Sequence, residues 1–252
     1  MIISFQHKTQ EFISDLSKGI DISIPLTSES AGPKCFNAPN FKIEPVISGN
    51  FIGEISAGSP VNFRNIIINP HGNGTHTECV GHITAEPYSI NQCLTEFHFV
   101  AFLVTIMPEK MHERDYVITE NVLRNKIGES EQTPAIIVRT LPNTDEKLKK
   151  DYSGTNPAYF SEDAMLYLNN RDIVHLLTDL PSVDRAEDGG RLLAHKAFWD
   201  WPLIPNKKKT ITEMVYIDNV VPDGLYLCNI QIASIESDAS PSKIVIYPLN
   251  KL

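Results

Sequence analysis

The sequence predicts one strand-rich α/β domain, and three observations support this. Its 252 residues, of which 42% are hydrophobic, can bury one large core without disulfide bonds. Apolar segments of strand length outnumber helical ones, and several are continuous runs, as in strands covered on both faces. No internal repeat divides the chain, and the one stretch resembling a linker, residues 141–157, is too short to mark a boundary. We therefore expect a single domain over residues 1–252.

The N-terminal part predicts a helix, a strand and a long loop. In residues 5–18 apolar side chains recur close to helical spacing, and Gly19 is placed to end such a helix. Residues 20–26 alternate between apolar and polar, which is typical of a half-buried strand. Residues 27–41 are rich in Ser, Pro, Gly and Asn, so we expect a long loop, and long ordered loops tend to be functional.

The rest of the chain alternates apolar runs with two helical segments. Residues 119–128 predict a helix capped by Thr119, and residues 161–170 predict another capped by Ser161. Further strands are expected at residues 64–70, 99–107, 135–141, 172–180, 210–217, 225–233 and 243–249.

Composition and charge argue against several classes of partner. With 22 Lys and Arg against 31 Asp and Glu, the net charge is −9, so the chain is a poor candidate for binding nucleic acid or an anionic membrane. Its 4 cysteines form no Cys-x-x-Cys pair, which fits reduced thiols in a cytosol. The first residues lack the apolar stretch of a signal peptide, and no apolar run approaches membrane-spanning length. We expect a cytoplasmic protein.

The segment at residues 69–83 is the richest in chemistry. It contains His71, His76, Glu78 and His82 among glycines and prolines, so we expect an irregular backbone on which these side chains converge. Neutral imidazole and carboxylate are the usual ligands of zinc and similar divalent ions. The spacing alone also allows a polar loop whose histidines cap neighbouring strands.

This segment resembles the signature of the cyclase family of metal-dependent hydrolases, which includes bacterial kynurenine formamidase (arylformamidase) and isatin hydrolase. That signature reads His-x-Gly-Thr-His-x-Asp-x-x-x-His. Here Gly74, Thr75 and His76 match its centre, Glu78 stands where the family has Asp, and His82 matches the last His.

A second block strengthens the resemblance. The family carries Pro-Ser-Val-Asp followed by a His and later by a Glu, and this chain has the same residues at 181–184, then His195 and Glu213. Taken alone, His195 would be read as a packing residue, and Glu213 as either solvent-facing or buried against a cation. Smaller similarities occur at residues 21–26, 137–140 and 240–249, so the resemblance spans nearly the whole chain.

The resemblance implies a swivelling β/β/α-type fold and a centre with one or two ions of zinc or manganese. The ligands it implies are His76, Glu78, His195 and Glu213, with His82 as general acid/base. The implied activity is hydrolysis of a small-molecule amide or lactam at a non-peptide C–N bond, with metal-bound water as the nucleophile. By the same analogy we expect a homodimer, and no motif for a further cofactor occurs.

Two departures from the family signature affect these expectations. His71 lies five residues before His76 rather than four, so either a one-residue bulge beside Gly72 brings His71 to the metal or that ligand is missing. Glu78 is longer than Asp by one methylene, about 1.5 Å. The departures motivate an alternative, in which the chain is a catalytically impaired member that binds a small molecule or a metal.

The loop at residues 31–41 bears on the substrate. Kynurenine formamidase-like members have a Trp-Pro-Gly-Asp type stretch there, whereas this chain has neither the Trp nor the acidic residue. Phe36 and Phe41 could stack on an aromatic or apolar ligand and Lys34 could meet a carboxylate, or the loop could simply pack over the core. We therefore expect a preferred substrate other than N-formylkynurenine.

Overall fold

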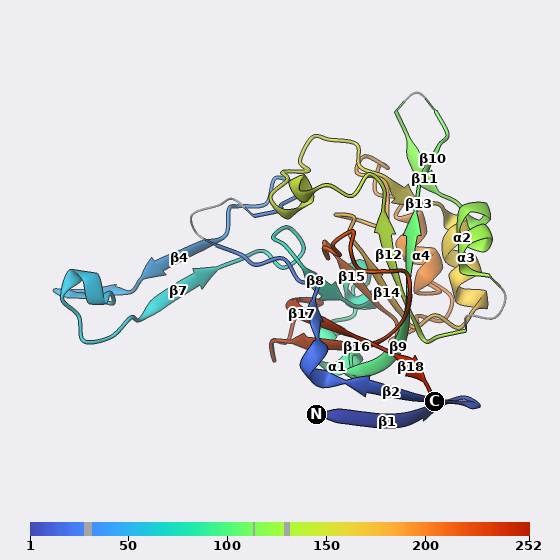
Figure 1. The fold of residues 1–252 in the computed structure, drawn as a ribbon. Helices are drawn as coiled ribbons and strands as arrows, with labels where there is room; N and C mark the ends of the chain where they lie inside the picture. The colour runs from blue at the N-terminus through green and yellow to red at the C-terminus, as the bar shows by residue number, and fades with distance from the viewer. Residues whose placement is uncertain (28–31, 113, 129–131) are drawn as a thin grey trace.

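The computed structural model describes residues 1–27, 32–112, 114–128 and 132–252, and its body is a mixed β-barrel (Figure 1). Hydrogen bonding orders the main sheet as β16-β9-β12-β14-β15-β8-β17-β3, and β16 also pairs with β17, so seven strands close on themselves. The strands are β3 (Ile20–Asp21), β8 (His76–Glu78), β9 (His98–Ile106), β12 (Ala135–Thr140), β14 (His175–Thr178), β15 (Thr210–Glu213), β16 (Gly224–Ile232) and β17 (Ala239–Pro248).

The central strands β9, β12, β14 and β15 run parallel, and the others pair antiparallel. Alternate residues of β12 divide between two apolar clusters: Ile137 belongs to one inside the barrel, and Ile136 to one beneath the helices. Because both faces are covered, all six residues of β12 are buried. This confirms the expectation drawn from continuous apolar runs.

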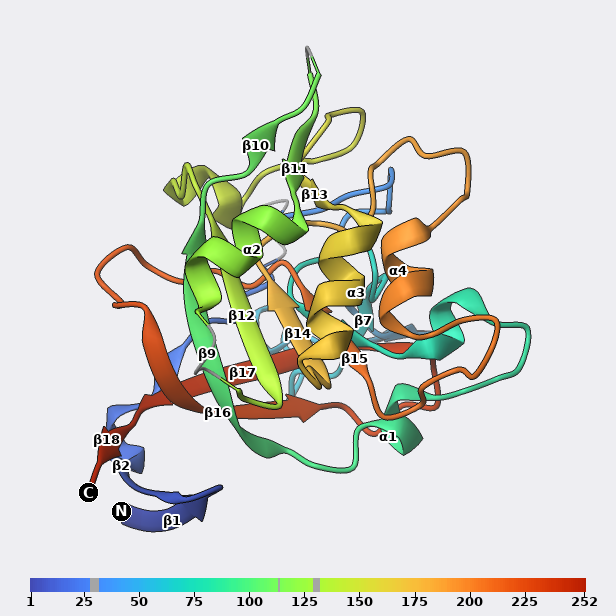
Figure 2. The same cartoon turned by 90° about the vertical axis from the view of Figure 1, so that its right-hand side faces the viewer.

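Three helices cover one side of the barrel, namely α2 (Glu120–Ile127), α3 (Glu162–Asn170) and α4 (Leu193–Phe198) (Figure 2). The expected helices at residues 119–128 and 161–170 are confirmed. Thr119 caps α2, since its hydroxyl accepts the backbone N–H of Val122. Ser161 holds the N-cap position of α3, although its hydroxyl bonds Asp163 and the carbonyl of Ile118 instead.

The expected N-terminal helix over residues 5–18 is wrong. The structure has an antiparallel hairpin of β1 (Ile2–His7) and β2 (Gln10–Asp15), and β18 (Asn250–Lys251) pairs with β2. Apolar positions 12, 13 and 16 fit a helix, but Phe12 and Ser14 are the buried pair, which is the period of a strand. The strand expected at residues 20–26 is reduced to β3. Part of the loop expected at residues 27–41 lies outside the described residues.

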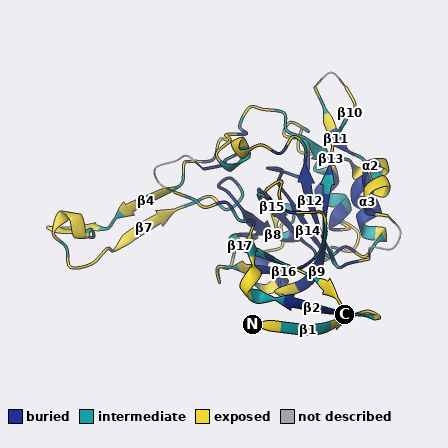
Figure 3. Cartoon of the chain, in the orientation of Figure 1, coloured by how far each residue is buried: buried dark blue, intermediate teal, exposed yellow. Residues whose placement is uncertain are grey.

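A long arm, residues 42–67, projects from the barrel, and within it β4 (Lys42–Pro45) pairs with β7 (Arg64–Ile67) (Figure 1). The strand expected at residues 64–70 therefore exists but lies outside the barrel, and the arm is mostly exposed (Figure 3). The remaining elements are β5 (Ile47–Ser48), β6 (Phe51–Ile52), β10 (Glu109–Lys110), β11 (Tyr116–Ile118), β13 (Tyr159–Phe160), α1 (Ile90–Cys93), and the 3₁₀ turns Leu16–Lys18, Ile55–Ala57, Val80–Ile83 and Asp145–Leu148. Within the described residues, no helix has the length and apolar character needed to cross a membrane.

Candidate metal centre

The centre is built on two neighbouring strands. His76 and Glu78 are two residues apart on β8, so their side chains share one face of the strand. Glu213, at the end of β15, is the cross-strand partner of His76, and its Oε2 lies 3.4 Å from His76 Nε2. All three side chains are buried. The segment is thus not irregular throughout, as the sequence suggested, because β8 itself presents two of the candidate ligands.

His71 reaches this centre from the turn before β8, despite its displacement by one residue. Its Nδ1 lies 2.9 Å from Glu78 Oε2. The turn is held by Asn69, whose side chain accepts the N–H of Gly72 at 2.9 Å. A Cβ at Gly72 would lie 2.2 Å from the Cβ of Ala38, so only glycine allows the turn to pack there.

His195 approaches Glu78 from the opposite side. It lies on α4, and its Nε2 is 3.1 Å from Glu78 Oε1. Asp184 accepts the backbone N–H groups of Ala194 and His195 at the start of this helix, and its Oδ2 lies 2.6 Å from His195 Nδ1. Asp184 therefore caps the helix and fixes the imidazole ring together.

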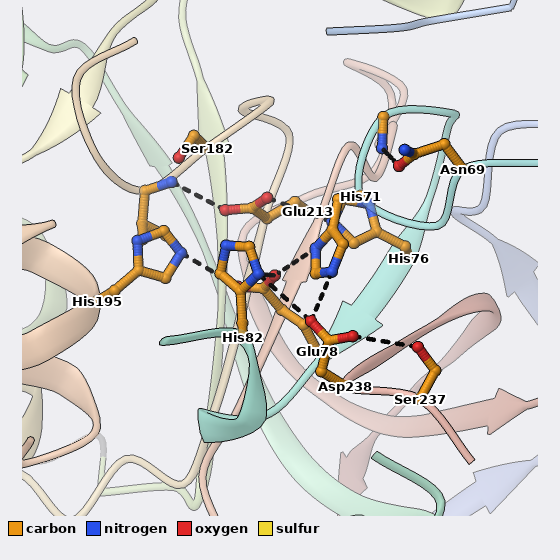
Figure 4. A network of polar contacts seen from close by, with 12 residues as sticks. Asn69, His71, His76, Glu78, His82, Ser182, His195, Glu213, Ser237 and Asp238 are labelled. Atoms are coloured by element: carbon orange, nitrogen blue, oxygen red, sulfur yellow. Dashed lines mark hydrogen bonds and ion pairs between the residues drawn. The ribbon is translucent and has the colours of Figure 1, made fainter. Parts of the chain in front are cut away.

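His82 completes the group from the turn after β8. Its side chain is 31% exposed, and Nδ1 lies 3.9 Å from Glu78 Oε2 (Figure 4). The structure thus brings together all six side chains that the sequence singled out for metal and acid/base chemistry: His71, His76, Glu78, His82, His195 and Glu213.

The ionisable groups at the centre shift one another's pKa values. Burial alone would lower the pKa of His71, but hydrogen bonds to Asp238 and Glu78 raise it to about 10. Burial would likewise lower the pKa of His195, but its contacts with Asp184 and Glu78 raise that pKa to about 10. Burial would raise the pKa of Glu78, yet the neighbouring histidines hold it well below its usual value. Protons on two histidines therefore balance the carboxylates where a cation would otherwise do so.

The ring nitrogens of His76 indicate whether the centre suits a cation. The ring of His76 places Nδ1 3.0 Å from the carbonyl oxygen of Gly74, so Nδ1 carries the proton and Nε2 a free lone pair. Nε2 is fully buried and has no hydrogen-bond partner within the described parts of the chain. A buried lone pair that faces the Glu213 carboxylate is what a divalent cation with nitrogen and oxygen ligands requires.

A cavity of about 230 Å³ opens onto the centre, and Phe36 lies at its wall with Arg185. Phe41 does not join it: it lines a separate small depression with Leu26 and Lys34. Lys34 is paired with Asp151 at 3.2 Å. Of the two aromatic residues proposed for the substrate, the structure brings only Phe36 to the centre.

Sequence reasoning missed Asp238, in the connection between β16 and β17. Its Oδ2 lies 2.8 Å from His71 Nε2 and 3.5 Å from His82 Nδ1. Both contacts with histidine lower the pKa of Asp238. The residue immediately precedes β17 and the C-terminal similarity at residues 240–249, so its position in the chain was the one signal that could have found it.

The fold and the centre define a barrel protein with a histidine–carboxylate site suited to a divalent ion. The chain belongs to the family described as "Putative cyclase", whose sequence pattern matches residues 20–185, which confirms the resemblance found in the sequence. No curated protein sequence matches the chain.

Solved structures share the fold at low sequence identity. A potential metal-dependent hydrolase with cyclase activity has a TM-score of 0.65 at 17% identity, over 91% of this chain and 97% of that one. A predicted metal-dependent hydrolase from Bacillus stearothermophilus has a TM-score of 0.62 at 18% identity, over 91% and 98%. Isatin hydrolase A from Labrenzia aggregata, bound to benzyl benzoate, has a TM-score of 0.65 at 14% identity, over 91% and 93%.

Proposed function

We propose that this protein is a metal-dependent hydrolase that cleaves a non-peptide C–N bond in a small-molecule amide or lactam. The observation that carries the proposal is the buried, unpartnered Nε2 of His76 facing Glu213, within a cluster of histidines and carboxylates beside a cavity. Solved structures described as a potential and a predicted metal-dependent hydrolase share the fold and support the proposal.

Residues from four parts of the chain would hold the ion. His76 and Glu213 offer Nε2 and Oε2 from adjacent strands, while Glu78 stands between His71 and His195. Glu213 is oriented for this because its other oxygen, Oε1, accepts the N–H of Val183 at 2.9 Å. Nitrogen and oxygen ligands of this kind suit zinc or manganese.

When bound, a divalent ion supplies a Lewis acid that activates water and stabilises the negative charge developing on the carbonyl oxygen. The chain itself contributes proton transfer. His82 lines the cavity and is partly exposed, so it can reach a substrate. As general acid/base it would take a proton during attack and deliver it to the leaving nitrogen. Phe36 would cover the apolar part of the substrate.

The metal is tested first, on protein purified without added ions. Elemental analysis should find about one or two equivalents of zinc or manganese. His76→Ala and Glu213→Ala should each empty the site, whereas Glu236→Ala, which removes an exposed carboxylate outside the cluster, should retain the metal. Unchanged metal content in both site variants would rule out the assignment.

Catalysis is tested with a panel of formamides, cyclic imides, lactams and lactones, assayed with added zinc and manganese. Turnover on an amide or lactam supports the hydrolase. Stoichiometric metal without turnover on any compound favours the alternative, a family member that only binds a metal or a small molecule. The highest kcat/KM for N-formylkynurenine, near about 10⁴ M⁻¹s⁻¹, would contradict the expectation drawn from residues 31–41.

We also propose that the protein forms a homodimer through its arm. Exposed apolar side chains concentrate along residues 47–67, where they would be costly in a monomer. A second copy of the same chain would cover these side chains, and no other partner protein is then needed. The apolar residues in question are Ile47, Phe51, Ile52, Ile55, Val61, Phe63, Ile66 and Ile67.

A further inference from the structure

Two histidines flank Glu78 in the same manner. His195 turns Nε2 toward Glu78 Oε1 and Nδ1 toward Asp184, at 3.1 and 2.6 Å. His71 turns Nδ1 toward Glu78 Oε2 and Nε2 toward Asp238, at 2.9 and 2.8 Å. Each ring therefore has one nitrogen facing the shared carboxylate and the other facing an aspartate of its own. Figure 4 shows His71 in this position, with Glu78 and Asp238 beside it.

This arrangement has a chemical consequence for a metal site. A histidine can give a metal the lone pair of only one ring nitrogen, and its other N–H usually donates to a carboxylate that fixes the tautomer and the ring orientation. Asp184 is placed to do this for His195. Asp238 is placed to do it for His71, although the two aspartates come from unrelated parts of the fold.

We infer that Asp238 is a positioning residue of the metal centre, which keeps a proton on His71 Nε2 and leaves Nδ1, on the side of Glu78, free to bind the metal. The inference rests on the proposed metal-dependent function. It also explains how a histidine displaced by one residue from the family spacing serves as a ligand: its ring is held from behind by a carboxylate outside the signature segment.

The position of Asp238 is itself built by close packing. Its carbonyl oxygen accepts the N–H of Cys79 at 3.0 Å, next to Glu78 on β8. Its Oδ1 accepts the hydroxyl of Ser237 at 3.1 Å, which leaves Oδ2 for His71. A Cβ on Gly81 would lie 2.1 Å from the carbonyl oxygen of Tyr88 and 3.1 Å from the Cβ of Asp238, so glycine is needed where these segments pack together.

The same oxygen of Asp238 also faces His82. Oδ2 lies 3.5 Å from His82 Nδ1 and 2.8 Å from His71 Nε2, and the two rings are 4.2 Å apart between centroids. Asp238 therefore directs His82 so that Nε2 points away from the aspartate. One carboxylate thus aligns both the candidate ligand and the candidate proton carrier.

The decisive variant is Asp238→Asn, with Glu236→Gln as the matched control in the same loop. Glu236 is exposed and bonds Asn91 and Gln92 rather than a histidine. Zinc affinity, measured by competition with a chelator, should fall about 10–100-fold in Asp238→Asn and stay unchanged in the control. In a His71→Ala background, Asp238→Asn should have no further effect, because the positioned ring is gone.

Two outcomes would overturn the inference while leaving the proposed function intact. One is wild-type zinc affinity in Asp238→Asn. The other is the loss of one of two bound equivalents, which would make Asp238 a ligand. A wild-type protein that binds no zinc would instead overturn the proposed function itself.

A measurement on the wild-type protein avoids any difficulty with the folding of a variant. Nitrogen NMR of ¹⁵N-histidine-labelled, zinc-loaded protein distinguishes a protonated ring nitrogen from a metal-bound one. We expect the proton of His71 on Nε2 and the metal on Nδ1. A proton on Nδ1 would refute the positioning role, because Nε2 is the nitrogen that faces Asp238.

Discussion

Glu78→Asp should weaken the centre, although it restores the residue that the family signature carries at this position. In the structure the Glu78 carboxylate spans two histidines, with Oε2 2.9 Å from His71 Nδ1 and Oε1 3.1 Å from His195 Nε2. Removing a methylene withdraws the carboxylate by about 1.5 Å. Because the two histidines lie on opposite sides of Glu78, the shortened side chain can stay close to one of them but not to both, so at least one of the two hydrogen bonds is lost.

The size of the effect follows from the hydrogen bond that is lost. A hydrogen bond to a charged partner contributes about 1.5–3 kcal/mol, so a loss of about 1.5–3 kcal/mol is expected for the metal-free protein. For a chain of this length that lowers Tm by about 3–12 °C. Thermal unfolding followed by circular dichroism in the presence of a chelator measures this, and titration calorimetry should show weaker zinc binding.

Glu96→Asp provides the control, since it shortens an exposed carboxylate outside the centre in the same way and should leave Tm unchanged. Unaltered Tm together with equal or tighter zinc binding in Glu78→Asp would refute the reasoning. It would mean that Glu78 does not span the two histidines and that the centre tolerates either length of side chain.

The remaining predictions concern proton transfer, pH and assembly. His82→Ala should retain its metal and lose about 10²–10⁴ in rate; metal loss would make His82 a ligand. Burial lowers the pKa of His175 to about 4. As the pH falls, the imidazole is therefore protonated in the unfolded chain before it is protonated in the folded protein. Stability should therefore fall between pH 6.5 and 4 by up to about 3 kcal/mol, and His175→Asn should flatten that profile in urea titrations; parallel profiles would contradict the assignment. The double variant Phe63→Asp with Ile66→Asp should be a monomer by light scattering. Ile204→Asp, at an exposed apolar site outside the arm, should remain a dimer. A dimer in both variants would mean that the arm is not the interface.

The sequence predicted the barrel strands well because burial on both faces leaves a simple signature. The runs at residues 99–107 and 135–141 correspond to β9 and β12, whose neighbours all lie within the same sheet. It failed at residues 5–18, where a short hairpin buries only one narrow face. There the few apolar residues satisfy helical spacing and strand spacing alike.

The candidate centre was predictable to the extent that it is local in sequence. His71, His76, Glu78 and His82 lie within one segment, so their convergence followed from composition and spacing. His195 and Glu213 came only from the family resemblance, because the register of β15 against β8 and the cap of α4 join distant residues. Asp238 lies outside the segment at residues 69–83 and matches no residue of the family signature, so only the folded chain shows its role.

The placement of β8 also determines when during synthesis the candidate centre can form. This three-residue strand lies between β15 and β17, so its neighbours emerge from the ribosome long after it does. Until Ala239 pairs with Glu78, the strand that carries two candidate ligands has an open edge. Such non-local pairing is slow to form. The nascent chain therefore exposes its histidines before it can organise them, and the candidate centre is complete only once β17 has paired with β8.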